Sequence, residues 1–191
     1  MSSLPHSVVT PEEYLEAERK AALRSEYADG QVFAMSGASR KHNRIAFNIA
    51  HVLGEQFRGG SCQVFGLDLK VRVKPRGPYY YPDLAVVCGE PQFQDVSEDV
   101  LLNPKVIIEI LSPSTESYDR GGKFQEYRQL ESLGEYLLVA QDHVQVDHFV
   151  RKPDGHWDFS STGTLDAVVE LPTIGARLKA SDIYDRVKFE A

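Results

Sequence analysis

The hexapeptide Val106-Ile-Ile-Glu-Ile-Leu111 is the stretch of this sequence that decides the fold. It is short, dense in β-branched side chains, and interrupted by one charge, at Glu109. A second run of the same kind, Leu84-Ala-Val-Val-Cys88, follows directly after Asp83. Strands that read as unbroken apolar runs are buried on both faces and lie centrally in a sheet. We therefore expect two central strands that each bring one carboxylate into an apolar region.

Asp83 and Glu109 are unusual because an ionised carboxylate in apolar surroundings is costly unless it is paired or binds a metal. Two carboxylates on neighbouring strands would also repel each other. A divalent cation relieves both problems, and magnesium favours sites of one or two carboxylates completed by waters and substrate phosphate. The alternative is that Glu109 faces solvent or pairs with an arginine such as Arg120.

The N-terminal half predicts a helix, a hairpin, a second helix and a strand. Thr10, Pro11 and Glu13 form a capping box that opens a helix reaching about Leu23. A turn at residues 28–31 separates strands at 26–27 and 32–35. Apolar side chains recur every fourth residue on one face of a longer helix over residues 39–57: Ile45, Ile49, Leu53 and Phe57. Residues 67–74 alternate apolar and charged side chains, which predicts one half-buried strand with a polar face.

The C-terminal half predicts a sheet with one further long helix. A long loop over residues 89–104 precedes the second apolar strand, and a helix runs from about Gly121 to Leu133. A hairpin joins residues 135–140 to 144–150, a strand pair follows near 157–159 and 168–171, and a short helix begins near Ser181. We expect one α+β (mixed α/β) domain over residues 1–191, with helices on the faces of a central mixed sheet and extra C-terminal strands. Residues 1–7 are expected to be flexible.

Composition places the chain among ordinary globular proteins, with 42% apolar and 26% charged residues. The net charge of −7 argues against a nucleic-acid coat protein, but an enzyme with a local basic patch remains compatible with it. No apolar run is long enough to span a membrane, and the N-terminus lacks a signal peptide, so a cytoplasmic location is expected. Cys62 and Cys88 form no CxxC pair and are predicted to be free, buried thiols.

Lys123 is the third candidate for chemistry. It is expected in the first turn of the helix that begins near Gly121, where a cation opposes the helix dipole. From there it can reach back toward the carboxylates, where an ammonium group orients a water or stabilises charge developing on a phosphate. The alternative is a solvated surface lysine.

Two basic clusters are candidates for phosphate contacts, with solvated surface charge as the alternative. One lies on the strand before Asp83 and the other at the start of the second helix: Lys70, Arg72, Lys74 and Arg76, and Arg40, Lys41 and Arg44. His42, inside the second cluster, is read as a surface or packing residue. In the run Tyr79-Tyr80-Tyr81, core packing is expected for one tyrosine and surface exposure for the other two, with base stacking as the alternative.

The sequence resembles the bacterial "putative restriction endonuclease" family, whose members have a PD-(D/E)XK nuclease core. The resemblance extends from about residue 8 to 185, and five stretches carry it: Ser25–Gly30, Tyr81–Val87, Val106–Thr115, Asp119–Lys123 with Tyr127, and Glu135–Tyr136. It implies a restriction endonuclease-like sheet flanked by helices. It also implies Mg²⁺ or Mn²⁺ bound by Asp83 and Glu109, DNA as substrate, phosphodiester hydrolysis by an activated water, and a homodimer.

Two further positions take their meaning from this resemblance. Glu26 matches an N-terminal acidic position that the family implies as an added metal ligand. The signature lysine of the superfamily should stand two residues after the glutamate, where this chain has Leu111. Lys123 looks like its replacement.

Three hypotheses follow. The first is a Mg²⁺-dependent DNA endonuclease with Asp83, Glu109 and Lys123 as catalytic residues. The second is a non-catalytic nuclease-fold module that binds DNA or a protein partner, which the leucine at 111 and the acidic charge favour. A two-carboxylate glycosidase needs one protonated carboxyl, and Lys123 nearby would hold both ionised. The deciding observation is whether Glu26, Asp83, Glu109 and Lys123 converge in one cleft with a metal or an ordered water between them.

Overall fold

The computed structural model describes residues 9–35, 37–66 and 68–189. The expectation of a flexible segment at residues 1–7 therefore lies outside the described residues. The helices are α1 (Pro11–Glu18), α2 (Arg40–Gln56), α3 (Glu116–Tyr118), α4 (Phe124–Tyr127) and α5 (Ala180–Ile183), and a π-helical turn, η1 (Asp119–Lys123), joins α3 to α4. Within the described residues, none of the helices combines the length and apolar character that crossing a membrane requires.

The six-stranded sheet contains both apolar runs that dominate the sequence. Its order is β11 (Trp157–Thr162), β10 (Val146–Arg151), β9 (Glu135–Ala140), β8 (Val106–Leu111), β6 (Leu84–Cys88) and β3 (Cys62–Gly66). Strand β8 pairs antiparallel with β6 and parallel with β9, so the sheet is mixed. Strands β6 and β8 are adjacent and both lie inside the sheet, as their dense apolar sequences predict.

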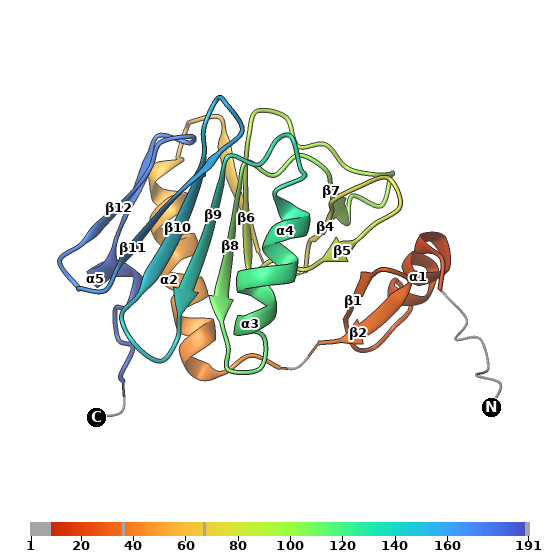
Figure 1. Cartoon of the computed structure of the whole chain (residues 1–191), viewed down its shortest axis with the longest axis horizontal. Helices are drawn as coiled ribbons and strands as arrows, with labels where there is room; N and C mark the ends of the chain where they lie inside the picture. The colour runs from red at the N-terminus through yellow and green to blue at the C-terminus, as the bar shows by residue number, and fades with distance from the viewer. Residues whose placement is uncertain (1–8, 36, 67, 190–191) are drawn as a thin grey trace.

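A second, five-stranded sheet lies beside the first. Its order is β2 (Gln31–Ala34), β1 (Ser25–Ala28), β5 (Tyr79–Tyr80), β4 (Lys70–Arg72) and β7 (Val100–Leu101). The extra C-terminal strands are β12 (Val168–Leu171) and β13 (Ala176–Lys179), which pair with each other. The predicted α+β architecture is confirmed: mixed sheets with flanking helices (Figure 1).

The two faces of the six-stranded sheet have different cores. Ile108 and Ile110 of β8 pack with the apolar face of α2, whereas Ile107 and Leu111 pack with Tyr127 of α4. Figure 1 shows α2 on one side of this sheet and the α3–α4 segment on the other. Since side chains alternate along a strand, Glu109 must project from the α3–α4 face.

Several predicted elements differ in length or pairing. Helix α1 carries the predicted capping box but ends at Glu18, not Leu23. The strand predicted over 67–74 is regular only at β4, and Leu67 lies outside the described residues. The strand pair predicted near 157–159 and 168–171 is wrong, because β11 pairs with β10 and β12 pairs with the unpredicted β13. A turn at Gly175, whose φ is +62°, makes that last hairpin possible.

The prediction of two free thiols is also wrong. Cys62 and Cys88 are joined by a disulfide, because the register of β3 against β6 places them directly opposite each other. Disulfides persist in oxidising compartments and are rare in the cytosol. The cytoplasmic location therefore stays a prediction.

Reducing this disulfide is expected to lower the free energy of unfolding. The bond closes a loop with a sequence separation of 26, for which the chain-entropy model gives about 3.5 kcal/mol. Urea unfolding with and without reductant measures the difference. A Cys62→Ala/Cys88→Ala variant is the control, since its stability should not respond to reductant. An equal reductant effect on both proteins would contradict the prediction.

Candidate active site

Glu26, Asp83, Glu109 and Lys123 come from four separate segments and line one cleft of about 580 Å³. Glu26 lies on β1, Asp83 directly precedes β6, Glu109 lies on β8 and Lys123 ends η1. The pairing of Leu84 with Ile108 sets the preceding Asp83 beside Glu109.

Lys123 is the centre of this cluster. Its Nζ lies 3.0 Å from Oε1 of Glu26, 3.0 Å from Oε1 of Glu109 and 3.8 Å from Oδ1 of Asp119. The ammonium group is buried, so the surface-lysine alternative does not apply. Sequence reasoning missed Asp119, although its spacing of four from Lys123 along a helix is the signal that would have indicated it.

The predicted position of Lys123 in a first helical turn is wrong. The helical segment begins at Glu116, and Gly121 and Gly122 lie inside the π-helical turn instead of opening the helix. The dipole argument therefore has no force here. π-helical turns occur frequently at functional sites, because the added residue shifts the side chains that follow.

Asp83 is held by two contacts. Its Oδ2 accepts a hydrogen bond of 2.7 Å from the backbone N–H of Ile110, and its Oδ1 lies 3.1 Å from Nε2 of His42. His42 reaches the cleft from the first turn of α2, and its Nδ1 is buried without a protein partner among the described residues. The interpretation of His42 as a surface or packing residue overlooked this contact, which links segments far apart in the chain.

Glu26 and Glu109 are also fixed by neighbours. Oε1 of Glu26 accepts a hydrogen bond of 2.9 Å from the backbone N–H of Tyr81, and the hydroxyl of Tyr127 donates to Oε1 of Glu109 over 3.2 Å. Arg120, the alternative partner of Glu109, instead pairs with Glu116 and Asp147. The buried carboxylate at 109 is therefore compensated mainly by Lys123.

Burial and like charges dominate the electrostatics of the cluster. Burial raises the pKa of Glu109 well above its ordinary value, the Lys123 ammonium opposes that rise, and Asp119, Asp83 and Glu26 add to it. Burial likewise raises the pKa of Asp119, and the Lys123 ammonium again opposes the rise. Burial alone would lower the pKa of Lys123, but Glu109, Glu26 and Asp119 together hold it well above its ordinary value. Four carboxylates face one ammonium, so the cleft attracts cations.

The two predicted basic clusters differ from each other in burial and in ion pairing. Lys70 is buried against Asp99 at 2.9 Å, whereas Lys74 and Arg76 are exposed and Lys74 pairs with Glu126 at 2.8 Å. Phosphate binding by this cluster stays a prediction. Tyr79, Tyr80 and Tyr81 are all buried, so core packing applies to all three and the surface exposure expected for two of them is wrong. In the other cluster Arg40 and Arg44 are exposed and Lys41 is half-buried near the N-terminal end of α2.

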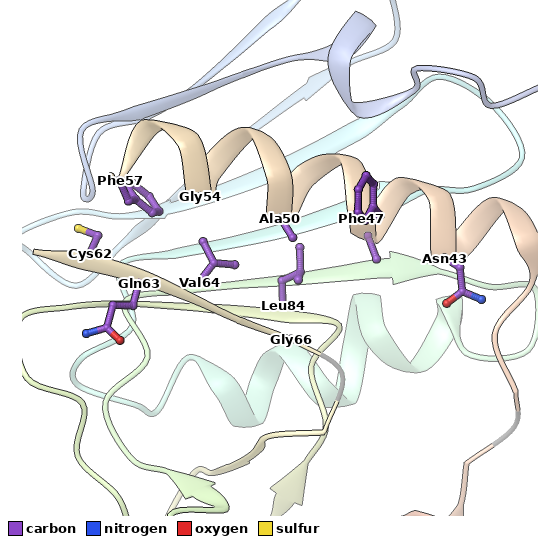
Figure 2. A pocket seen from close by; sticks show the side chains of 11 residues that line it. Asn43, Phe47, Ala50, Gly54, Phe57, Cys62, Gln63, Val64, Gly66 and Leu84 are labelled. Atoms are coloured by element: carbon purple, nitrogen blue, oxygen red, sulfur yellow. The ribbon is translucent and has the colours of Figure 1, made fainter. Parts of the chain in front are cut away.

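A second pocket, of about 630 Å³, has a different character (Figure 2). It lies between α2 and β3, and its lining is mainly apolar, including Phe47, Ala50, Val64 and Leu84. No acidic or basic side chain is among its described lining residues. This apolar pocket therefore lacks the acidic and basic groups that line the carboxylate cleft.

Comparisons with known proteins identify the family of this chain. A family model described as "Uma2: Putative restriction endonuclease" matches residues 11–181. The chain belongs to the Uma2 family. Membership supports a nuclease function, and the family resemblance read from the sequence is confirmed.

Similar proteins span nearly the same length. Two uncharacterised proteins of Synechocystis sp. are each 35% identical to this Uma2 chain: slr1290 over 187 residues, covering 98% of this chain and 97% of the relative, and sll1609 over 164 residues, covering 86% and 93%. A crystal structure titled as "a putative nuclease belonging to DUF820" from Anabaena variabilis has a TM-score of 0.76 and 19% identity, covering 92% of this chain and 97% of that one. At this identity the likeness shows a shared fold.

Proposed function

We propose that this chain is a divalent-cation-dependent DNA endonuclease and that the cleft of Asp83, Glu109 and Lys123 is its active site. The observation that carries the proposal is the convergence of the three residues, with Glu26, in one cleft of a nuclease-family protein. Among the described residues, no group of three or more His, Cys, Asp or Glu side chains could hold a metal ion. Magnesium does not require such a group, because it is usually bound by one or two carboxylates plus waters and substrate phosphates.

The donor set fits a hard cation. The described contacts of the Glu109 side chain are made to Oε1, which lies 3.0 Å from Nζ of Lys123 and accepts a hydrogen bond of 3.2 Å from the hydroxyl of Tyr127. Asp83 supplies a second carboxylate at the same cleft, only partly buried and oriented by the Ile110 amide. Asp83 and Glu109 would hold the cation, and Glu26 would assist. A cation bound there supplies a water of lowered pKa and offsets the charge of a phosphate.

The protein's own groups have separate roles in this proposal. Lys123, held by Glu26 and Glu109, supplies a fixed positive charge that stabilises the developing charge on the phosphate without reorganisation. Lys123 would replace the signature lysine of the superfamily, because the signature position is occupied by Leu111, an apolar side chain packed in the core. His42 positions Asp83 and does not itself contact the substrate.

Cation affinity is expected to rise with pH. A carboxylate ligand must be deprotonated, and burial together with neighbouring carboxylates raises the pKa of Glu109. Below that pKa, Mg²⁺ affinity should increase by up to about tenfold per pH unit. Calorimetric titration in buffers of different ionisation enthalpy measures both the affinity and the proton released. Asp119→Asn is the matched variant. It removes a charge that repels Glu109 and should shift the pH dependence of Mg²⁺ affinity to lower pH. Affinity independent of pH would contradict this prediction.

Plasmid nicking tests the proposed function. Wild-type protein with Mg²⁺ or Mn²⁺ is expected to convert supercoiled plasmid to nicked and linear forms, and Asp83→Ala is expected to lose this activity. Equal cutting by both proteins would identify the activity as contamination. Tight cation binding without cleavage by the wild type would favour the alternative, a nuclease-fold module that binds DNA or a protein partner without cutting. The homodimer stays a prediction, which light scattering after gel filtration measures.

A further inference from the structure

Strand β2 is exposed along its whole length beside the carboxylate cleft. Its register against β1 pairs Phe33 with Glu26 and Val32 with Tyr27. Residues directly opposite each other in an antiparallel pair project from the same face. Phe33 therefore shares the face of Glu26, toward the cleft, while Val32 lies on the other face.

Three exposed large apolar side chains line the same cleft as the carboxylates: Phe33, Met35 and Tyr118. They are 49%, 40% and 41% exposed, respectively. Tyr118 is held in place, because its hydroxyl lies 3.0 Å from that of Tyr80 and the two rings meet edge to face. Apolar surface gathered at a polar cleft marks a binding site for a ligand with an apolar or aromatic part.

The charges that line the cleft indicate which chemical groups of a ligand it can bind. Lys123 and His42 are the basic side chains among its described lining residues, and Lys123 is already engaged by Glu26 and Glu109. Affinity for duplex DNA comes mainly from many phosphate contacts with lysine and arginine. This cleft wall offers aromatic faces instead, and exposed cations lie beyond it on α2, at Arg40 and Arg44.

We propose, on the basis of the nuclease function proposed above, that the substrate of this cleft is DNA with unpaired bases. A base stacks against Phe33 and Tyr118, with Met35 completing the apolar wall, while the adjoining phosphate lies toward the carboxylates. In a duplex the flat faces of the bases are covered by their neighbours, so only an unpaired base offers a face for stacking. A single strand, or an end or mismatch that releases a nucleotide, provides such a base.

Fluorescence anisotropy with labelled oligonucleotides tests this proposal. The probes are a single strand and the duplex of the same sequence, with Ca²⁺ in place of Mg²⁺ to limit cleavage. We expect wild-type protein to bind the single strand at least about tenfold more tightly than the duplex. Phe33→Ala should lose about tenfold in affinity for the single strand and change little on the duplex. Tyr118→Phe should keep its affinity, because the ring face is retained.

Val32→Ala is the matched control, since Val32 neighbours Phe33, is 46% exposed and lies on the opposite face. Equal losses in Phe33→Ala and Val32→Ala, or equal wild-type affinity for both probes, would overturn the proposal. A Phe33→Ala protein that no longer self-associates in gel filtration, with unchanged DNA affinity, would reassign the patch to a contact between copies. These outcomes are separate from the nuclease proposal: Asp83-dependent cutting of paired and unpaired DNA at equal rates would leave the nuclease standing and refute only the substrate preference.

Discussion

Glu109→Gln is expected to reduce phosphodiester cleavage by about a thousandfold or more. Glutamine keeps the shape of the side chain and removes the negative charge that a divalent cation requires. Lys123 retains Glu26 at 3.0 Å and Asp119 at 3.8 Å, so the variant should remain folded. Single-turnover cleavage of plasmid measures the loss, and thermal melting checks the fold.

The matched control for this variant is Glu135→Gln. Glu135 is an equally buried glutamate that contacts His148 and Thr173 and does not line the cleft. Its replacement should lower stability and leave the cleavage rate of the folded protein unchanged. If Glu109→Gln cuts at the wild-type rate, or if both variants lose activity alike, Glu109 is not a catalytic ligand.

Lys123→Met is expected to lower the free energy of unfolding of the cation-free protein by about 3 to 5 kcal/mol near neutral pH. The substitution keeps an unbranched side chain and removes the only buried cation described next to Glu26, Glu109 and Asp119. Urea unfolding measures the loss. Lys152→Met is the control, because Lys152 pairs with Asp158 at the exposed surface and should cost less than about 1 kcal/mol.

The pH dependence of Lys123→Met separates lost charge from lost packing. Burial already raises the pKa of Glu109 and Asp119, and without the ammonium both values rise further. A raised carboxyl pKa means that the folded state binds more protons than the unfolded state, so stability falls as pH rises through the folded pKa. The deficit against wild type should therefore shrink at acidic pH. Glu109→Gln in the same chain should restore part of the stability. A deficit that is constant with pH would indicate a packing defect instead.

The central strands could be predicted because their signals are local. The apolar runs of β6 and β8 require burial on both faces, and the alternation within β8 fixes which face carries Glu109. The capping box at Thr10 and the turn at Gly30 are set by a few neighbouring residues. The family resemblance then indicated which carboxylates form one site, which the periodicity of the sequence does not show.

The remaining features depend on contacts between distant segments. The interaction of His42 with Asp83 requires the position of α2 relative to β6, which no local pattern contains. The Cys62–Cys88 bond follows from strand register, and register is set by the whole sheet. The helix predicted to begin near Gly121 begins at Glu116, and contacts of Asp119 and Lys123 with distant residues stabilise the π-helical turn that contains Gly121.

The chain passes from one sheet to the other between Tyr80 and Leu84, and Asp83 lies at that crossing. Glu26 belongs to the five-stranded sheet and Glu109 to the six-stranded sheet, and the described strands of the two sheets form separate hydrogen-bonded ladders. Lys123 binds a carboxylate from each sheet, so its ammonium group links the two sheets at their boundary. Any sliding of one sheet on the other would change the spacing between the carboxylates before it disturbed either ladder. Because the site lies at the boundary between the two sheets, its geometry is more sensitive to small deformations than the fold is.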